Sequence, residues 1–245
     1  AQRLLTLAAV IGRQFDLPLL RAAAGPDAEA VDGSLREWLS RRLVRGVSSA
    51  YDFSHDKIRS VVYHATGAAQ RRLHLRVGEA MEGLYIAQPE AVCAQLAYHY
   101  ERADSRNKAL IYLPMAAARA ASVYANQEAL NYYDRALALL EKDDSRRWEI
   151  LLRRMQVLHL TGQYDEARAA GWQVVEATQD SAGAQWVAAQ AANELSAIYR
   201  ASHDYDDARA WGERARQLAA CSEDPAAQAR AKQSLAEVER ARGNF

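Results

Sequence analysis

The segment GQYDEAR at residues 162–168 returns in similar form as HDYDDAR at residues 203–209. The tyrosines of these two segments are 41 positions apart (205 − 164), and a weaker copy, NQEAL at residues 126–130, lies 38 positions earlier at its alanine (167 − 129). Phe245 occupies the same aromatic position 40 residues after Tyr205 (245 − 205), so we expect a fourth copy there and a sequence that belongs to a larger protein. A near-constant period predicts stacked copies of one supersecondary unit.

Each copy predicts two antiparallel helices joined by a short turn. The helix before the turn is amphipathic, with apolar residues three and four positions apart, as in Leu151, Met155 and Leu158. Small side chains and tyrosines cluster at and after the turns. We predict that the following residues pack the two helices together: Ala129, Tyr133, Ala136, Tyr164, Ala167, Tyr205 and Ala208. The predicted fold class is therefore all-α.

Residues 91–245 resemble tetratricopeptide (TPR) repeats in their small and aromatic positions. The resemblance implies a right-handed α-superhelix of helical hairpins. The spacings of 38 to 41 residues exceed the TPR length of about 34 residues, and longer repeats of this kind resemble the superhelical arm of the maltose-operon activator. An unrelated array of helical hairpins is the alternative.

The first third of the sequence has a different pattern. Helical periodicity covers residues 4–11, 17–24 and 34–42, the last with Leu35, Trp38 and Leu39 facing inward. Residues 25–27 (Gly-Pro-Asp) are expected to separate the second helix from the third. Two short strands at residues 43–47 and 50–53 and a helix at residues 56–64 follow. Three helices and a β-hairpin are typical of a winged helix. We therefore predict a winged-helix domain at residues 1–66, linking helices at 67–106 and TPR-like repeats at 107–245.

Direct DNA binding by this domain is not expected. The candidate recognition helix carries Arg36, Arg41 and Arg42, but also Asp32 and Glu37, whereas a DNA-reading helix shows a clearer basic face. In the linking region, Arg71, Arg72, His74 and Arg76 are expected at the surface, either solvated or in contact with an acidic neighbouring domain.

The order of the motifs resembles one family of multidomain proteins. The segments FSHDKIR (53–59), QRRLH (70–74), AYHYERA (97–103) and YANQEALNYY (124–133) resemble bacterial signal-transduction ATPases of the STAND class, including relatives of the maltose-operon activator. In that class a nucleotide-binding domain precedes a winged helix and a TPR-like sensor arm. The resemblance implies that His55 contacts the β-phosphate of ADP held by the preceding domain. The alternative is that His55 only caps the helix that begins near Asp56 or bonds locally.

The composition fits a reduced, cytoplasmic protein. The 31 basic and 31 acidic residues cancel, so no overall field attracts nucleic acid or an anionic membrane. Cys93 and Cys221 match no metal-ligand spacing, and we expect buried thiols rather than a disulfide. No apolar run approaches the roughly 20 residues of a membrane-spanning helix.

The sequence predicts a non-catalytic function. It has no phosphate loop of the form GxxxxGK[ST] and no pairing of a nucleophile with a base, so we expect neither catalytic nor metal-ligating residues and no cofactor here, with ATP or ADP bound by the larger protein. The prediction is a protein-interaction and signal-sensing module that binds a partner or effector on its repeat arm. The alternatives are a free-standing TPR adaptor that binds a peptide and a DNA-binding winged-helix regulator.

Overall fold

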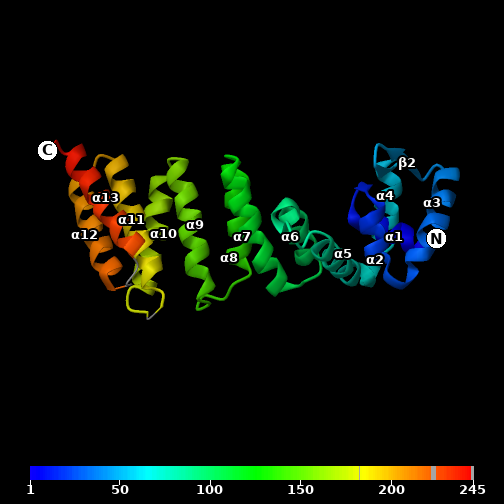
Figure 1. The fold of residues 1–245 in the computed structure, drawn as a ribbon, viewed down its shortest axis with the longest axis horizontal. Coiled ribbons are helices and arrows are strands. Elements are labelled where there is room, and N and C mark those ends of the chain that lie inside the picture. Colours follow the sequence, from blue (N-terminus) through cyan, green and yellow to red (C-terminus); the bar gives the residue numbers. More distant parts are fainter. Residues whose placement is uncertain (182, 222–224, 244–245) are drawn as a thin grey trace. The chain divides into compact units, whose positions relative to one another are not determined.

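The structure is a computed structural model that describes residues 1–181, 183–221 and 225–243. Its contacts divide the chain into two compact units, residues 1–116 and 117–245, with the division inside helix α7 (Arg106–Ser122). Figure 1 shows the elements of both units, and each unit is described separately below.

Unit 1 begins with short helices and a small sheet, followed by two longer helices and the first part of α7. In chain order the elements before α7 are α1 (Gln2–Ile11), β1 (Gln14–Phe15), α2 (Leu17–Ala24), η1 (Gly25–Ala30), α3 (Val31–Ser40), β2 (Val44–Val47), β3 (Ala50–Phe53), α4 (Asp56–His64), η2 (Gly67–Ala69), α5 (Gln70–Leu84), η3 (Pro89–Val92) and α6 (Cys93–Arg102). The break expected at residues 25–27 is a 3₁₀ turn that leads directly into α3.

The sheet has three antiparallel strands in the order β1-β3-β2, not the two-stranded hairpin expected from the sequence. β1 pairs with β3 through Gln14 opposite Asp52 and Phe15 opposite Tyr51. Two residues are too short for an alternating pattern to be detected, and this strand forms because Phe15 is buried against the hairpin. The assignment of these helices and strands to the winged-helix class stays a prediction.

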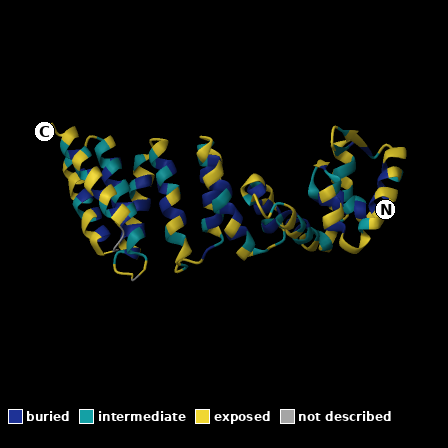
Figure 2. Cartoon of the chain, in the orientation of Figure 1, coloured by how far each residue is buried: buried dark blue, intermediate teal, exposed yellow. Residues whose placement is uncertain are grey.

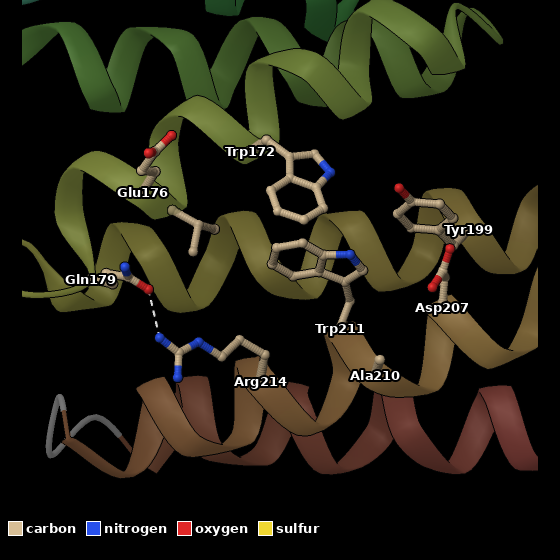
Figure 3. Close-up of a pocket in the computed structure, with 9 residues that line it drawn as sticks. Trp172, Glu176, Gln179, Tyr199, Asp207, Ala210, Trp211 and Arg214 are labelled. Atoms are coloured by element: carbon tan, nitrogen blue, oxygen red, sulfur yellow. Dashed lines mark hydrogen bonds between the residues drawn. The ribbon is translucent and has the colours of Figure 1, made fainter.

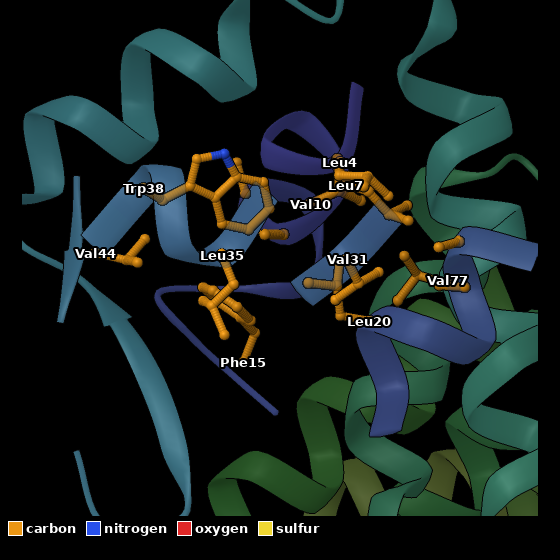
Figure 4. Packing of buried hydrophobic residues seen from close by; sticks show 14 of the residues in the cluster. Leu4, Leu7, Val10, Phe15, Leu20, Val31, Leu35, Trp38, Val44 and Val77 are labelled. Carbon is orange, nitrogen blue, oxygen red and sulfur yellow. The ribbon is translucent and has the colours of Figure 1, made fainter. Parts of the chain in front are cut away.

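An aromatic cluster holds the sheet against the helices of unit 1 (Figure 4). The ring of Phe15 packs edge-on to Trp38, with centroids 6.4 Å apart, and lies 5.9 Å from the ring of Phe53. All three side chains are buried. Leu39, expected inward with Trp38, is 39% exposed, because neighbouring residues on a helix point about 100° apart and Trp38 faces the cluster.

Helices α5 and α6 pack closely because Gly78 has no side chain. A Cβ atom added there would lie 3.1 Å from the ring of Tyr100. One turn later, the Glu82 carboxylate accepts hydrogen bonds from the Tyr100 hydroxyl at 2.7 Å, from Lys108 Nζ at 2.7 Å and from the Tyr112 hydroxyl. One carboxylate therefore joins three helices of unit 1.

Unit 2 consists of helices packed against their neighbours in chain order. Its helices after α7 are α8 (Asn126–Ala138), α9 (Arg146–Leu160), α10 (Tyr164–Thr178), α11 (Gln185–Ala201), α12 (Tyr205–Cys221) and α13 (Pro225–Ala241). The first helix of each hairpin also packs on the first helix of the next hairpin, α9 on α11 and α11 on α13. Figure 2 shows buried and exposed positions interleaved along these helices, as amphipathic helices require.

The turns of unit 2 repeat with the period of the sequence. Tyr124, Gly162, His203 and Gly243 have left-handed φ angles of 60°, 74°, 63° and 81° and are 38, 41 and 40 positions apart. After such a residue, Gln163 N–H donates to the Leu158 carbonyl at 2.9 Å, and Asp204 N–H donates to Tyr199 in the same way. This pattern is a Schellman cap, which ends one helix and directs the chain back along it. Phe245, the aromatic of the expected fourth copy, lies outside the described residues.

Small residues line the contacts between the helices. Ala129, Ala136, Ala167 and Ala208 are completely buried. A Cβ atom on Gly171 would lie 2.6 Å from Met155 Cε, so this position has no room for a methyl group. The buried Ser196 hydroxyl donates to the Ala208 carbonyl at 2.6 Å and so joins α11 to α12.

The all-α fold class, with helical-hairpin repeats and one small sheet, is confirmed. Cys93 is buried, but Cys221 is exposed, which corrects the expectation of two buried thiols. Across the described ranges, no helix is both long enough and apolar enough to cross a membrane.

Replacing Ala167 by Leu should destabilise unit 2. The site is completely buried, and overpacking a filled core costs about 1–3 kcal/mol. Ala169 lies on the same helix but is exposed, so Ala169→Leu is the control and should change stability by less than about 0.5 kcal/mol. Urea unfolding followed by circular dichroism measures both. Equal midpoints for the two variants would show that the helix contact is placed wrongly.

Candidate functional site

Unit 2 contains an open groove between α10 and α12, with a volume of about 580 Å³. α10 and its C-cap contribute Trp172, Val175, Glu176 and Gln179, and α12 contributes Asp207, Ala210, Trp211 and Arg214. Both sets follow the spacing i, i+3, i+4, i+7, which places each set on one face of its helix. Tyr199 of α11 completes the lining.

Two tryptophans form the centre of the groove (Figure 3). The indoles of Trp172 and Trp211 meet edge to face, with centroids 4.7 Å apart and an interplanar angle of 85°. Trp172 is nevertheless 52% exposed. A large aromatic side chain left half in water is typical of a surface that is covered when a ligand or partner binds.

Arg214 lies at one end of the groove. Its guanidinium donates to the Gln179 amide oxygen at 2.5 Å and to the Gln217 amide oxygen at 3.5 Å. In the part of the chain that the structure describes, no carboxylate pairs with it. Amide oxygens orient the guanidinium without neutralising it, so its charge remains available to an anionic group.

The opposite end of the groove carries Tyr199 and Asp207 (Figure 3). The Arg168 guanidinium lies 5.2 Å from the centroid of the Tyr199 ring and also pairs with Asp165 at 2.6 Å. The groove therefore has an aromatic middle, one end with Arg214 and the Glu176 carboxylate, and an acidic end at Asp207. Such a groove can hold an apolar group and orient its polar ends.

A second cavity of unit 2 is smaller and polar. It has a volume of about 110 Å³ and is lined by residues of α9, α11 and α13, including Gln156 and Asn193. The Asn193 side-chain oxygen is buried and accepts no hydrogen bond from the described residues. The groove between α10 and α12 is larger and has the exposed aromatic surface, so it is the stronger candidate.

The sequence prediction did not include any residue of this groove. It concerned the packing residues, and the structure places Tyr133 in the core and leaves Tyr164 and Tyr205 partly exposed at the first positions of α10 and α12. A signal was present, because Trp172 and Trp211 are each adjacent to a buried glycine, Gly171 and Gly212. Neighbours on a helix point about 100° apart, so a tryptophan beside a buried glycine is directed toward the surface.

His55 is the one polar site residue predicted from the sequence. It is exposed at the N-cap position of α4, directly after β3, and its side chain makes no capping hydrogen bond. The buried Phe53 anchors the preceding strand in the core of unit 1. A capping role for the imidazole is therefore not observed. The contact with nucleotide stays a prediction.

Unit 1 contains a buried histidine pair that the sequence did not reveal. His74, expected at the surface with its neighbouring arginines, is completely buried, and its Nδ1 lies 2.9 Å from Nδ1 of His99. The Tyr63 hydroxyl lies 2.9 Å from Nε2 of His74. Among the described residues, no third ligand completes a metal site here.

The environment keeps this pair neutral. Burial, with the positive charges of Arg102 and Arg59, lowers the pKa of His74 to about 4. Burial and the neighbouring His74 lower the pKa of His99 to about 3. Two neutral rings share one hydrogen between their Nδ1 atoms, whereas two charged rings would place two N–H groups against each other. The pair therefore joins α5 to α6 only while its rings are not both charged.

Comparison with known proteins shows similarity of fold. No model of a protein family matches the sequence, and no curated protein matches it. Among solved structures, BtubC (BKLC) from P. vanneervenii has a TM-score of 0.55 and 16% identity, over 93% of this chain and 85% of that chain. A STAND protein with a tetratricopeptide repeat sensor from Pyrococcus horikoshii has a TM-score of 0.48 and 11% identity, over 98% of this chain and 47% of that chain. At 16% identity, the similarity to BtubC concerns the fold alone. The TM-score of the second structure is too low to support a conclusion.

Lowering the pH from 7 to 5 should destabilise unit 1 through the histidine pair. Because both folded-state pKa values lie below the ordinary 6.5, the unfolded chain binds more protons below pH 6.5. The neutral pair therefore makes its full contribution to the free energy of unfolding above pH 6.5. This contribution falls as the pH drops toward 4, by up to about 1.4 kcal/mol per pH unit for each histidine. Urea unfolding gives the free energy of unfolding at each pH for the wild type and for the double variant His74→Gln/His99→Gln. This free energy should depend less steeply on pH in the variant. Parallel curves would contradict this account.

Proposed function

We propose that the repeat helices form the recognition and signal-sensing arm of a larger ATP-dependent regulator, transcriptional or signalling. The arm binds a protein partner or a small effector in the groove between α10 and α12. The observation that carries this proposal is the half-exposed Trp172, held against Trp211 beside an arginine without a carboxylate partner among the described residues.

The incomplete burial of Trp172 favours binding in the groove. An indole half in water loses the hydrophobic stabilisation of the part left uncovered, at roughly 25 cal/mol per Å². A ligand that covers both rings recovers it, and tryptophan and arginine dominate the binding energy of many interfaces. The volume of about 580 Å³ falls within the range of about 300–1,000 Å³ of ligand pockets.

The position of the groove suits a sensor. Its walls come from α10 and α12, which belong to successive hairpins, with Tyr199 of α11 between them. A ligand that bridges the two walls favours one spacing of the hairpins over others. Such a difference in affinity between two arrangements is what shifts a conformational equilibrium.

The link to an ATPase rests on the sequence resemblance to STAND proteins. In that arrangement unit 1 follows the nucleotide-binding domain, and His55 at the start of α4 contacts bound ADP. Its exposed, uncapped side chain is compatible with such a contact.

Two other functions remain as alternatives. A free-standing adaptor would use the same groove for a peptide without any nucleotide linkage. DNA binding through α3 is disfavoured, because Arg41 at the end of that helix pairs with Glu37 at 3.1 Å, which reduces the positive charge it offers. An upstream phosphate loop in the gene would distinguish the regulator from the adaptor.

Trp172→Ala should abolish most of the binding in the groove. Peptides selected from a phage-displayed random library against the whole chain provide the probe, and fluorescence polarisation gives their affinities. Loss of a central tryptophan should weaken binding by about 2 kcal/mol, roughly 30-fold. Tyr124→Ala is the control, because Tyr124 is an aromatic residue of the same unit that is 85% exposed and does not line the groove. Peptides that bind both variants as tightly as the wild type would refute the groove as the binding site.

His55→Ala should speed the release of ADP from the longer protein that carries the phosphate loop. Loss of one hydrogen bond to a charged group corresponds to about 1.5–3 kcal/mol in the closed state. Stopped-flow release of a fluorescent ADP analogue measures the rate. His64→Ala is the matched control, because His64 is an exposed histidine at the other end of α4. Equal rates for wild type and His55→Ala would leave His55 without a nucleotide-sensing role.

A further inference from the structure

Unit 1 contains a cavity of its own, separate from the two cavities of unit 2 described above. It has a volume of about 510 Å³ and lies between α1, the C-terminal end of α2, the C-terminal end of α4 and the first half of α5. Arg3, Arg72 and Arg76 line it, with Asp27 as the one acidic lining residue. Three cations against one anion give it a positive excess, although the whole chain is neutral.

The arginines of this cavity differ from five other arginines of unit 1, which are neutralised by ion pairs. Arg13, Arg21, Arg41, Arg45 and Arg71 each pair with a carboxylate. Arg3 and Arg72 have no ion pair with any described residue. Arg76 donates to the backbone carbonyl of Ala24 at the end of α2, which fixes its guanidinium without neutralising it.

The helices do not compensate these charges. Arg3 lies in the first turn of α1 and Arg72 in the first turn of α5, and neither first turn contains an acidic residue. The dipole of a helix favours negative charge at its N-terminal end, so cations there are disfavoured by their own helices. A bound anion would offset both effects within one cavity.

Apart from Thr6 and Thr66, the remaining wall is apolar. Leu4 and Leu7 of α1 are buried beneath the cavity, near Val77 (Figure 4), and Leu73 of α5 is partly buried beside them. Arginine forks match the tetrahedral oxygens of phosphate, with two parallel hydrogen bonds from each guanidinium. We propose that this cavity binds a small phosphate monoester, with its phosphate on Arg3 and Arg72 and its apolar body against the leucines.

Isothermal titration calorimetry of the whole chain with phenyl phosphate and with inorganic phosphate, at physiological ionic strength, tests this site. Phenyl phosphate should bind saturably and about tenfold more tightly than inorganic phosphate, because its ring covers the apolar wall. Arg72→Gln and Arg3→Gln should each weaken binding by about 10- to 100-fold through loss of charged hydrogen bonds.

Arg71→Gln is the matched control. Arg71 lies next to Arg72 in the same helical turn, but it pairs with Asp104 at 3.1 Å and does not line the cavity. It should change the affinity less than twofold. Arg76 is left unchanged because it also caps α2.

Three results would overturn the proposal. The first is absence of saturable binding at millimolar phenyl phosphate. The second is an equal loss in Arg71→Gln, which would reveal only a general attraction of anions. The third is a short DNA duplex that binds more tightly than phenyl phosphate and competes with it, which would make the arginines a nucleic-acid contact. Arg3→Gln and Arg72→Gln leave the groove of unit 2 unchanged, so a loss of affinity in these variants reports on this cavity alone.

Discussion

Packing in unit 2 depends on one backbone constraint, the left-handed residue that ends a helix and reverses the chain. Tyr124, Gly162 and His203 all adopt it, although only one is a glycine, and Gly243 has the same left-handed φ at the end of α13. Because the reversal takes only a few residues, the next helix is held close to the previous one. Close helices tolerate only small side chains between them, as the buried Ala167 and the missing space at Gly171 show. A non-glycine residue in this conformation is strained, and the Schellman hydrogen bonds and the helix contacts that follow compensate the strain.

The same closeness determines where large side chains lie. Since glycine and alanine occupy the contact between helices, the adjacent Trp172 and Trp211 are directed outward and meet above it. The groove is therefore a consequence of repeat packing, and any change in the spacing of α10 and α12 alters the distance between its walls. This coupling makes the groove a natural place for a ligand to act on the repeat.

Unit 1 is held together differently, by aromatic rings and by buried or partly buried polar contacts. Phe15, Trp38 and Phe53 fix the small sheet, while the Glu82 carboxylate and the His74–His99 pair join α5 to its neighbours. Polar contacts shielded from water are strong only when every member has its partner, so they specify one arrangement of the helices. The three arginines of the neighbouring cavity are the exception, because their charges have no such compensation within the unit.

The sequence by itself determined the all-α class, the helical hairpins and nearly every helix in unit 1, because periodicity and turn residues act locally. α4 was predicted at its observed bounds, and the αL position of the repeats follows the spacing of the GQYDEAR and HDYDDAR segments. The tertiary structure alone decided which distant residues meet. Phe15 pairs with Tyr51 of the hairpin, 36 residues later in the chain, and His74 of α5 contacts His99 of α6. Trp172 and Trp211 lie on separate helices, and the local sequence around them does not predict that their side chains meet. These features depend on burial and distance between elements, which a one-dimensional pattern does not contain.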